Sequence, residues 1–303
     1  MADIPDTQDS ASRLAAYNEI IRRERRQNDF VHKFCRNRVA LLGFGIIVAI
    51  LLLAILAPIL SSYDPNKIDL INPFLKPGQH GHIFGTDDYG RDLFSRILYG
   101  ARVSIVVSLG SILLGGLLGT LVGILAGYIG GAVDSILMRI MDGLSAFPYI
   151  LLSILLITVL GSGLFNVILA IGIGTIPGFA RVVRGQFSIL KNEEYCNAER
   201  VLGASDIRLA LVHILPNALP QIIVYATLHI ASAIISESAL SFLGLGIVAP
   251  TASWGNILRA GRGCLNSSPH IATIAGVFIL ITVIGFNLFG DGVRDVLDPK
   301  MKR

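Results

Sequence analysis

Long apolar runs without a charged residue constrain this chain more than any other feature of its sequence. Residues 39–60 and 271–290 each have the length of one bilayer-crossing helix, about 20 residues, and residues 103–133 suit one long or tilted helix. Lipid offers no hydrogen-bond partner, so the backbone polar groups of such runs must be satisfied within the segment, as they are in a helix. The runs therefore predict an all-α, polytopic membrane protein.

Two further apolar runs are too long for a single crossing. Residues 143–180 are interrupted by Gly161-Ser162-Gly163, which predicts two helices joined by a tight outer turn, the first of them beginning near Val133. Residues 217–258 are apolar apart from His229 and Glu237. Pro250 and Trp254 indicate that this run ends in a re-entrant or interfacial loop. In total, the sequence predicts about six membrane-spanning helices.

The distribution of basic residues predicts the orientation of these helices. Placing the N-terminus in the cytoplasm puts 18 of the 25 Lys and Arg residues on inner segments, as the positive-inside rule requires. Both termini are then cytoplasmic. The resulting order is a cytoplasmic tail (1–38), a first transmembrane helix (39–60), an outer loop (61–102), a transmembrane domain (103–290) and a second tail (291–303). In the first tail, a cluster of arginines would touch anionic lipid: Arg22, Arg23, Arg25 and Arg26.

The composition and the motifs that are missing exclude several classes of protein. Charged residues make up 15% of the chain, whereas soluble domains carry about a quarter. The three cysteines are far apart and the six histidines are scattered, so neither a disulfide framework nor a metal site is expected. No Gly-Lys pair occurs, which excludes a nucleotide-binding P-loop, and no catalytic motif is present. The net charge of +4 fits cytoplasmic Lys and Arg rather than binding to nucleic acid. We therefore expect no enzyme, and any ATP chemistry would lie on another chain.

Four glycines recur at every fourth position of the 103–133 run: Gly115, Gly119, Gly123 and Gly127. This spacing places a smooth groove on one face of the helix, where a second helix can approach closely. The second helix could belong to the same bundle, to a partner subunit or to a moving part. The sequence leaves these alternatives open.

The polar segment between the fourth and fifth spans predicts a protruding pair of short helices. Asn192 can cap a first helix with an acidic first turn, and Gly203 suits a left-handed stop. Ser205 can cap a second helix that ends at Pro216, where the next span begins. Such a knob would offer a contact to a cytoplasmic partner. The alternative is an interfacial loop that lies on lipid.

Several motifs resemble those of the dipeptide, oligopeptide and nickel permease family of bacterial ABC importers. The segment 184–216 is similar to the family's EAA coupling loop, with these matching positions: Asn197, Ala198, Glu199, Gly203, Leu215 and Pro216. The outer loop resembles the family's GTDxxGRD signature at Gly85, Thr86, Asp87, Gly90, Arg91 and Asp92. Further matches lie at 237–246, at Trp254-Gly255 and at 287–299. The EAA triplet departs from the pattern, because Asn197 replaces the usual acid and a carboxylate stands at Glu199 instead.

This resemblance implies a type I ABC importer permease fold and a pore-forming permease subunit of the second ("C") type in a bacterial inner membrane. It also implies a homologous second permease, two cytoplasmic ATPase subunits that hold ATP and Mg, and an extracytoplasmic solute-binding protein. The chain itself would bind no cofactor. The substrate would be a di- or oligopeptide, with nickel or another small solute as the alternative. A stand-alone secondary transporter would need internal repeats and several intramembrane charges, of which only Glu237 is found.

Glu237 permits two interpretations, because a carboxylate inside an apolar run is costly unless it faces a partner or water. It could tie two helices together near an outer gate through a hydrogen bond. Alternatively, it could line the pore and meet the amino group of a peptide.

Overall fold

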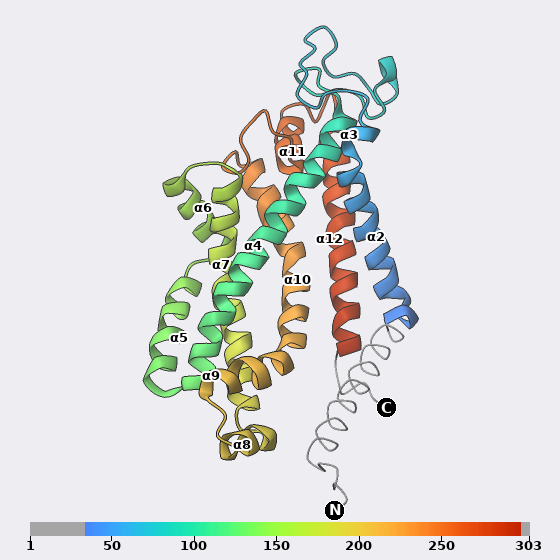
Figure 1. Cartoon of the computed structure of the whole chain (residues 1–303). Coiled ribbons are helices and arrows are strands. Elements are labelled where there is room, and N and C mark those ends of the chain that lie inside the picture. Colours follow the sequence, from blue (N-terminus) through green and yellow to red (C-terminus); the bar gives the residue numbers. More distant parts are fainter. Residues whose placement is uncertain (1–33, 298–303) are drawn as a thin grey trace, which may run out of the picture.

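The computed structural model describes residues 34–297, so the predictions for the remaining tails, including the arginine cluster, lie outside the described residues. Five long helices run side by side along the molecule (Figure 1): α2 (Arg38–Ile55), α4 (Leu93–Ile129), α7 (Leu164–Leu190), α10 (Leu215–Phe242) and α12 (His270–Leu297). Within residues 34–297 there is no strand, only an isolated bridge between Thr86 and Asp92. The all-α prediction is therefore confirmed for the described part.

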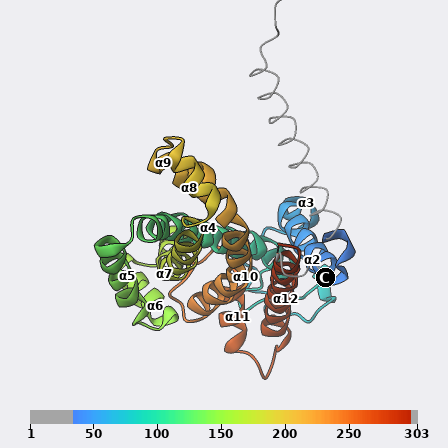
Figure 2. The ribbon, with the colours of Figure 1, turned by 90° about the horizontal axis from the view of Figure 1, so that it is seen from below.

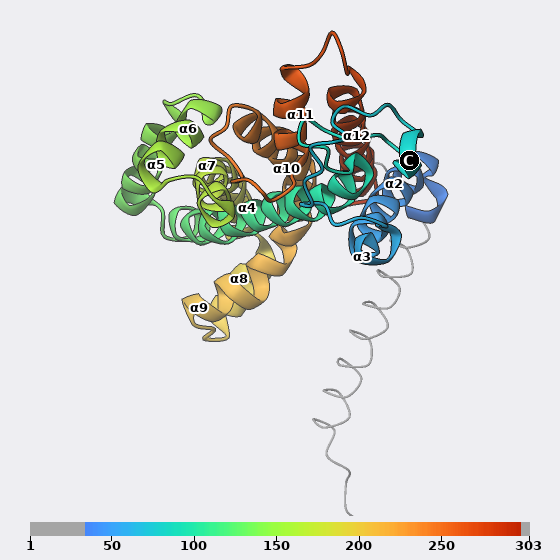
Figure 3. The same cartoon turned by 90° about the horizontal axis from the view of Figure 1, so that it is seen from above.

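Shorter helices connect the long ones: α3 (Ala57–Leu60), η1 (Gln79–Gly81), α5 (Gly131–Ser145), α6 (Tyr149–Leu160), α8 (Glu194–Val201), α9 (Asp206–Arg208), η2 (Leu209–Ile214) and α11 (Trp254–Arg262). The loop 61–92 and α11 lie at one end of the bundle, and α8 lies at the other, where α2 begins and α12 ends (Figure 1). Seen from below or above, α8 and α9 protrude from one side, while α6 and α11 lie on the opposite side (Figures 2 and 3).

All five long helices are apolar and long enough to cross a membrane, and α5 with α6 forms a sixth candidate that is bent by 86°. The predicted number of about six is thus reached only with a broken third span. The break falls at Pro148, the residue before α6, because a proline disfavours helical backbone at the preceding residue. The predicted turn at Gly161-Ser162-Gly163 is confirmed, since Gly161 and Gly163 both have positive φ.

Helix α4 begins ten residues earlier than predicted, at Leu93 rather than residue 103, so the loop that was expected to reach residue 102 ends at 92. The side chain of Asp92 caps this helix by accepting a hydrogen bond from Ser95 N at 2.7 Å. The early turns carry Arg96 and Arg102, which find partners outside the helix; Arg96 donates to Pro65 O at 3.0 Å. Arg102 donates hydrogen bonds to the carbonyls of Ala54 and Ile55 at the end of α2.

The fifth and sixth spans also differ from their predicted limits. Residues 206–242 are helical throughout, so the expected break at Pro216 is wrong. The π-helical turn η2 comes directly before Pro216, with Leu215 N bonded to Ala210 O, and this wider turn gives the proline ring room. Helix α10 ends at Phe242, and α11 is separate, as the predicted loop near Pro250 requires. Helix α12 continues to Leu297, into the region predicted as a tail from 291.

The glycine row of α4 packs against α7 of the same chain. A Cβ at Gly119 would lie 2.5 Å from Phe179 Cβ and 2.7 Å from Ile176 O, and one at Gly123 would lie 2.6 Å from Val183 Cβ. Gly115 and Gly127 face α7 in the same way. Of the alternatives that the sequence left open, the structure therefore shows packing inside the bundle.

Candidate functional site

Residues 191–214, which connect α7 to α10 and are called the knob below, are built around two turns. Gly203 has φ +85°, and two backbone hydrogen bonds close the end of α8, from Gly203 N to Arg200 O and from Ala204 N to Glu199 O. These bonds form a Schellman motif, which confirms the predicted left-handed stop. Ser205 then caps the next helix by accepting from Arg208 N at 3.4 Å, also as predicted.

The start of α8 differs from its prediction. Glu193, not Asn192, is the residue that precedes the helix, and it makes no capping hydrogen bond. Helix α7 continues to Leu190, so the side chain of Asn192 still lies over its last turn and donates to Ser188 O at 3.0 Å. The predicted second short helix begins at Asp206 as expected but does not end at Pro216, since α9 and η2 run directly into α10.

The knob is fastened to the end of α4 and exposes apolar side chains. Tyr128 Oη donates to Asp206 Oδ1 at 2.5 Å, and Lys191 Nζ donates to Gly127 O at 2.8 Å. Exposed fractions are 88% at Val201 and 80% at Leu202. Exposed apolar side chains on such a projection suit contact with another protein or with lipid, the two alternatives that the sequence left open.

The residues that match the EAA loop occupy different positions on this knob. Asn197 and Ala198 are exposed on α8, whereas Glu199 is half-buried and lies 3.8 Å from His213 Nε2 on η2. The displaced carboxylate thus faces η2 without a hydrogen bond to it, and Asn197 Oδ1 accepts from Arg200 at 3.3 Å. Pro216 is exposed and Leu215 half-buried where η2 meets α10.

A polar cavity of about 450 Å³ lies between the bend of α5–α6, α7 and α10. Its polar lining includes Arg181, Tyr225, His229 and Ser232. The His229 ring stacks on Tyr225 at 3.8 Å between centroids, and its Nδ1 lies 2.9 Å from Tyr225 O. Arg181 is already held by α5, because it donates to Asp142 at 3.2 Å and to Ser145 Oγ at 2.8 Å.

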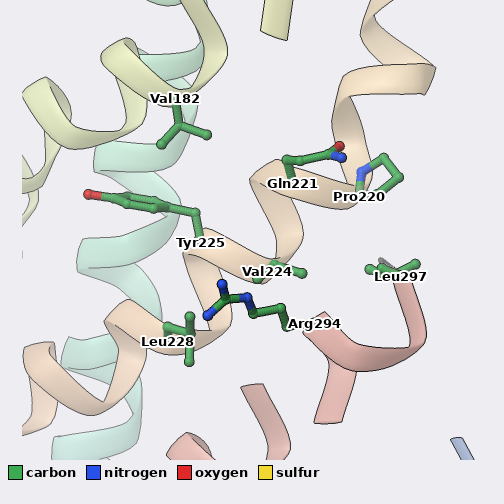
Figure 4. Close-up of a pocket in the computed structure, with 8 residues that line it drawn as sticks. All are labelled: Val182, Pro220, Gln221, Val224, Tyr225, Leu228, Arg294 and Leu297. Carbon is green, nitrogen blue, oxygen red and sulfur yellow. The ribbon is translucent and has the colours of Figure 1, made fainter. Parts of the chain in front are cut away.

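A second cavity of about 300 Å³ adjoins the first, between α7, α10 and α12. Tyr225 lines both (Figure 4). The walls of the second cavity are mostly apolar: Val182, Pro220, Val224, Leu228 and Leu297. Gln221 and Arg294 add the other polar groups.

Glu237 lies in neither cavity and is fully buried. It accepts hydrogen bonds from Ser104 Oγ of α4 and from Ser241 Oγ, each at 2.9 Å. Ser241 Oγ in turn accepts from Ile247 N at 3.2 Å, in the loop that follows α10. This geometry supports the structural interpretation, in which the carboxylate ties two helices together.

The outer-loop motif folds onto itself and onto the start of α4. Arg91 Nε donates to Asp87 Oδ2 at 2.7 Å, and Arg96 Nε lies 3.3 Å from the same oxygen. Asp92 bonds to Ser95 and also lies 2.8 Å from His82 Nδ1. Thr86 Oγ1 donates to Asn72 O at 2.7 Å. The motif therefore holds the loop 61–92 in one shape.

Two glycines of this motif lie where two backbone segments of the loop pass very close to each other. A Cβ at Gly85 would lie 2.1 Å from Leu75 O, and one at Gly90 would lie 1.8 Å from Asp69 O. Partial burial, and then the neighbouring Asp87 carboxylate, raise the pKa of Asp88. The motif residues thus act as a scaffold for the loop 61–92.

We expect Gly90→Ala to loosen this loop, because the added methyl group would collide with the Asp69 carbonyl. Gly78→Ala is the matched control, since Gly78 also has positive φ (+83°) but no atom within 4 Å of a Cβ. Limited proteolysis of the purified protein should cut the Gly90→Ala loop at least about fivefold faster than the control. Equal cleavage rates would contradict the scaffold role.

Comparison with known protein families identifies the family of this chain. Residues 119–303 match the family of binding-protein-dependent transport system inner membrane components, and residues 28–77 match the N-terminal transmembrane domain of oligopeptide transport permease C. The chain belongs to this transport family. The permease fold predicted from the sequence is thereby confirmed.

Individual relatives agree with the family. The chain is 46% identical to the glutathione transport system permease protein GsiD of Salmonella typhimurium, over 90% of both chains. It is also 46% identical to the oligopeptide transport system permease protein OppC of Bacillus subtilis, over 91% and 90%. A chain of the MetNI methionine ABC transporter, solved in inward-facing conformations, has the same fold, with a TM-score of 0.55 and 21% identity over 66% of this permease and 96% of that chain.

Sequence reasoning on this permease missed most cavity residues. Arg181, Tyr225 and Arg294 come from three helices that only the fold brings together. His229 carried a usable signal, because it is the only histidine in the 217–258 run and Glu237 is the only carboxylate there. A polar side chain in a membrane-spanning run faces a partner or a cavity. Here Glu237 faces its serine partners, and His229 faces a cavity.

Proposed function

We propose that this chain is one pore-forming subunit of an ATP-driven importer of short peptides in a bacterial inner membrane. The observation that carries the proposal is the continuity of α10, which lines both cavities and extends directly into the exposed knob. A push on the knob can therefore reach the cavity walls without crossing a flexible joint. Short peptides are the substrate class because the relatives are named for oligopeptides and for glutathione, a tripeptide.

The proposed partners would supply the parts of an importer that this single chain lacks. The cavities adjoin along one side of α10, which suits one wall of a pore, and a homologous permease would supply the opposite wall. Two ATPase subunits would bind the knobs and carry ATP and Mg, while a solute-binding protein would dock on the scaffolded outer loop. This chain would bind no cofactor and catalyse no covalent step. The excess of basic residues on predicted inner segments supports cytoplasmic termini.

The motion of the ATPase subunits would reach the helix bundle through the end of the knob that is hydrogen-bonded to α4. When the ATPases close, α8 would move with them, and the rigid turn at Gly203 would pass the displacement to α9 and α10. The hydrogen bond from Tyr128 to Asp206 would carry the same motion to α4. Two helices of the bundle would then shift together and switch the cavity between its inner and outer openings.

The test is uptake by the reconstituted complex with a variant of the knob, Gly203→Asp. No atom lies within 4 Å of a Cβ at Gly203, so the change costs roughly 1 kcal/mol in backbone strain and leaves the bundle intact. We expect normal membrane insertion, less co-purified ATPase and at least about tenfold slower ATP-driven peptide uptake.

Gly78→Asp is the matched control, because Gly78 has a similar φ of +83° and an equally open surrounding, and it belongs to the loop 61–92 and not to the knob. It should retain the ATPase subunits in full. Uptake and ATPase retention at wild-type levels in Gly203→Asp would remove the coupling role from this segment. Failure of the wild-type complex to import any peptide would contradict the substrate class.

A further inference from the structure

We infer that the crevice between α7, α10 and α12 binds the carboxylate end of the transported peptide, with Arg294 as its anion-binding group. The inference rests on the proposed function and adds a site to it. It starts from the charge of the two adjoining cavities. Their lining residues include two arginines and no carboxylate, so every formally charged side chain in the lining is positive.

The two arginines differ in whether an acidic side chain already neutralises them. Arg181 forms an ion pair with Asp142 at 3.2 Å. Arg294 has no ion pair or hydrogen bond to any part of the chain that the structure describes. Figure 4 shows its guanidinium directed toward α10, beside Val224 and Leu228, instead of away from the crevice. Arg294 is solvent-exposed and makes no ion pair within residues 34–297, so its guanidinium is accessible to a bidentate anion such as a carboxylate.

A second unsatisfied group faces the same crevice. The Gln221 side-chain oxygen is buried and has no hydrogen-bond partner within the described residues. A buried acceptor without a donor is costly, so a ligand that brings an N–H group would gain affinity here. A peptide end offers both complements, a carboxylate for Arg294 and a backbone N–H for Gln221.

The surroundings accommodate the rest of such a ligand. Val182, Pro220 and Leu297 form apolar walls that suit a peptide side chain of varied size. Beyond Tyr225, the larger cavity presents His229 and Ser232, which can contact the next peptide groups. The C-terminal residue would therefore lie in the crevice, and the remainder of the peptide would extend past Tyr225.

The experiment measures equilibrium binding to the complete transporter in nanodiscs of zwitterionic lipid, without the binding protein. The probes are trialanine and trialanine amide, which differ only in the terminal charge. The wild-type complex should bind the free acid at least about tenfold more tightly than the amide. Arg294→Gln should abolish this preference, and Arg294→Lys should retain part of it.

Two further variants make the result specific. Arg139→Gln removes an exposed arginine on α5 that lines neither cavity, and it should behave as wild type. Gln221→Leu should weaken both probes equally and leave the acid-to-amide ratio unchanged, because it removes an acceptor for N–H and no charge.

Equal binding of the two probes by the wild type, or an unchanged preference in Arg294→Gln, would overturn the inference. Loss of the second permease from purified Arg294→Gln would overturn it as well, since Arg294 would then pair with that subunit. If added anionic lipid abolished the preference, the crevice would belong to a lipid headgroup. In each case, uptake of trialanine by the wild-type complex with its binding protein shows whether the proposed function stands independently.

Discussion

Gly119→Ala is expected to lower the stability of the permease by about 2 kcal/mol, because the new methyl group has no room between α4 and α7. It would lie 2.5 Å from Phe179 Cβ and 2.7 Å from the Ile176 carbonyl oxygen. Neither atom is at the end of a flexible side chain, so a whole helix must move. The thermal unfolding midpoint of the purified complex in detergent should fall by several degrees.

Gly116→Ala provides the control on the same helix, one turn earlier. Its Cβ would lie 3.5 Å from the Phe179 ring, an ordinary van der Waals distance. Alanine also has a higher helix propensity than glycine, so this variant should be neutral or slightly more stable. If the two variants had the same midpoint, the close α4–α7 contact would not contribute to stability as we infer.

The turns of this protein were predictable because their chemistry is local. Gly161-Ser162-Gly163 and Gly203 adopt the positive φ that glycine alone adopts without strain, and Ser205 caps a helix from its own sequence position. Glycine spacing likewise revealed a close helix contact on α4. The identity of the second helix was not predictable, because that depends on the arrangement of the bundle.

The limits of the helices were harder to predict, since charged residues inside them are neutralised by distant partners. Arg96 lies in the second turn of α4 but is paired with Asp87 from the preceding loop, so the helix begins before the uncharged run. Pro216 suggested a helix end, yet the π-helical turn η2 before it removes the conflict. Such compensation appears only once the three-dimensional contacts are known.

The candidate site was the least predictable part. The crevice combines Val182 of α7, Gln221 of α10 and Arg294 of α12, and no short sequence motif links them. Of these three, only Arg294 falls within a segment that resembles a family motif, residues 287–299, and that resemblance assigned it no role. A sequence therefore indicates local turns and loop contacts more readily than a cavity that distant helices build together.

Glu237→Leu is expected to destabilise the bundle by roughly 2–4 kcal/mol, because it removes the acceptor to which buried serine hydroxyl groups donate. The carboxylate accepts from Ser104 and Ser241 at 2.9 Å each, and Ser238 Oγ lies at 3.4 Å. Leucine is similar in size but cannot accept any of these bonds. Thermal unfolding of the purified complex should therefore shift to a clearly lower temperature, and less assembled complex should be recovered.

Glu237→Gln separates the two interpretations of this residue. The amide oxygen can accept from one serine, and the amide nitrogen can donate to the oxygen of another, so the tie between α4 and α10 survives. We expect assembly close to wild type and most of the peptide uptake. A double-mutant cycle of Glu237→Leu with Ser104→Ala should give a coupling energy of about 1 kcal/mol or more. An intact complex that loses uptake with glutamine would show that the charge itself is needed, and the purely structural role would be wrong.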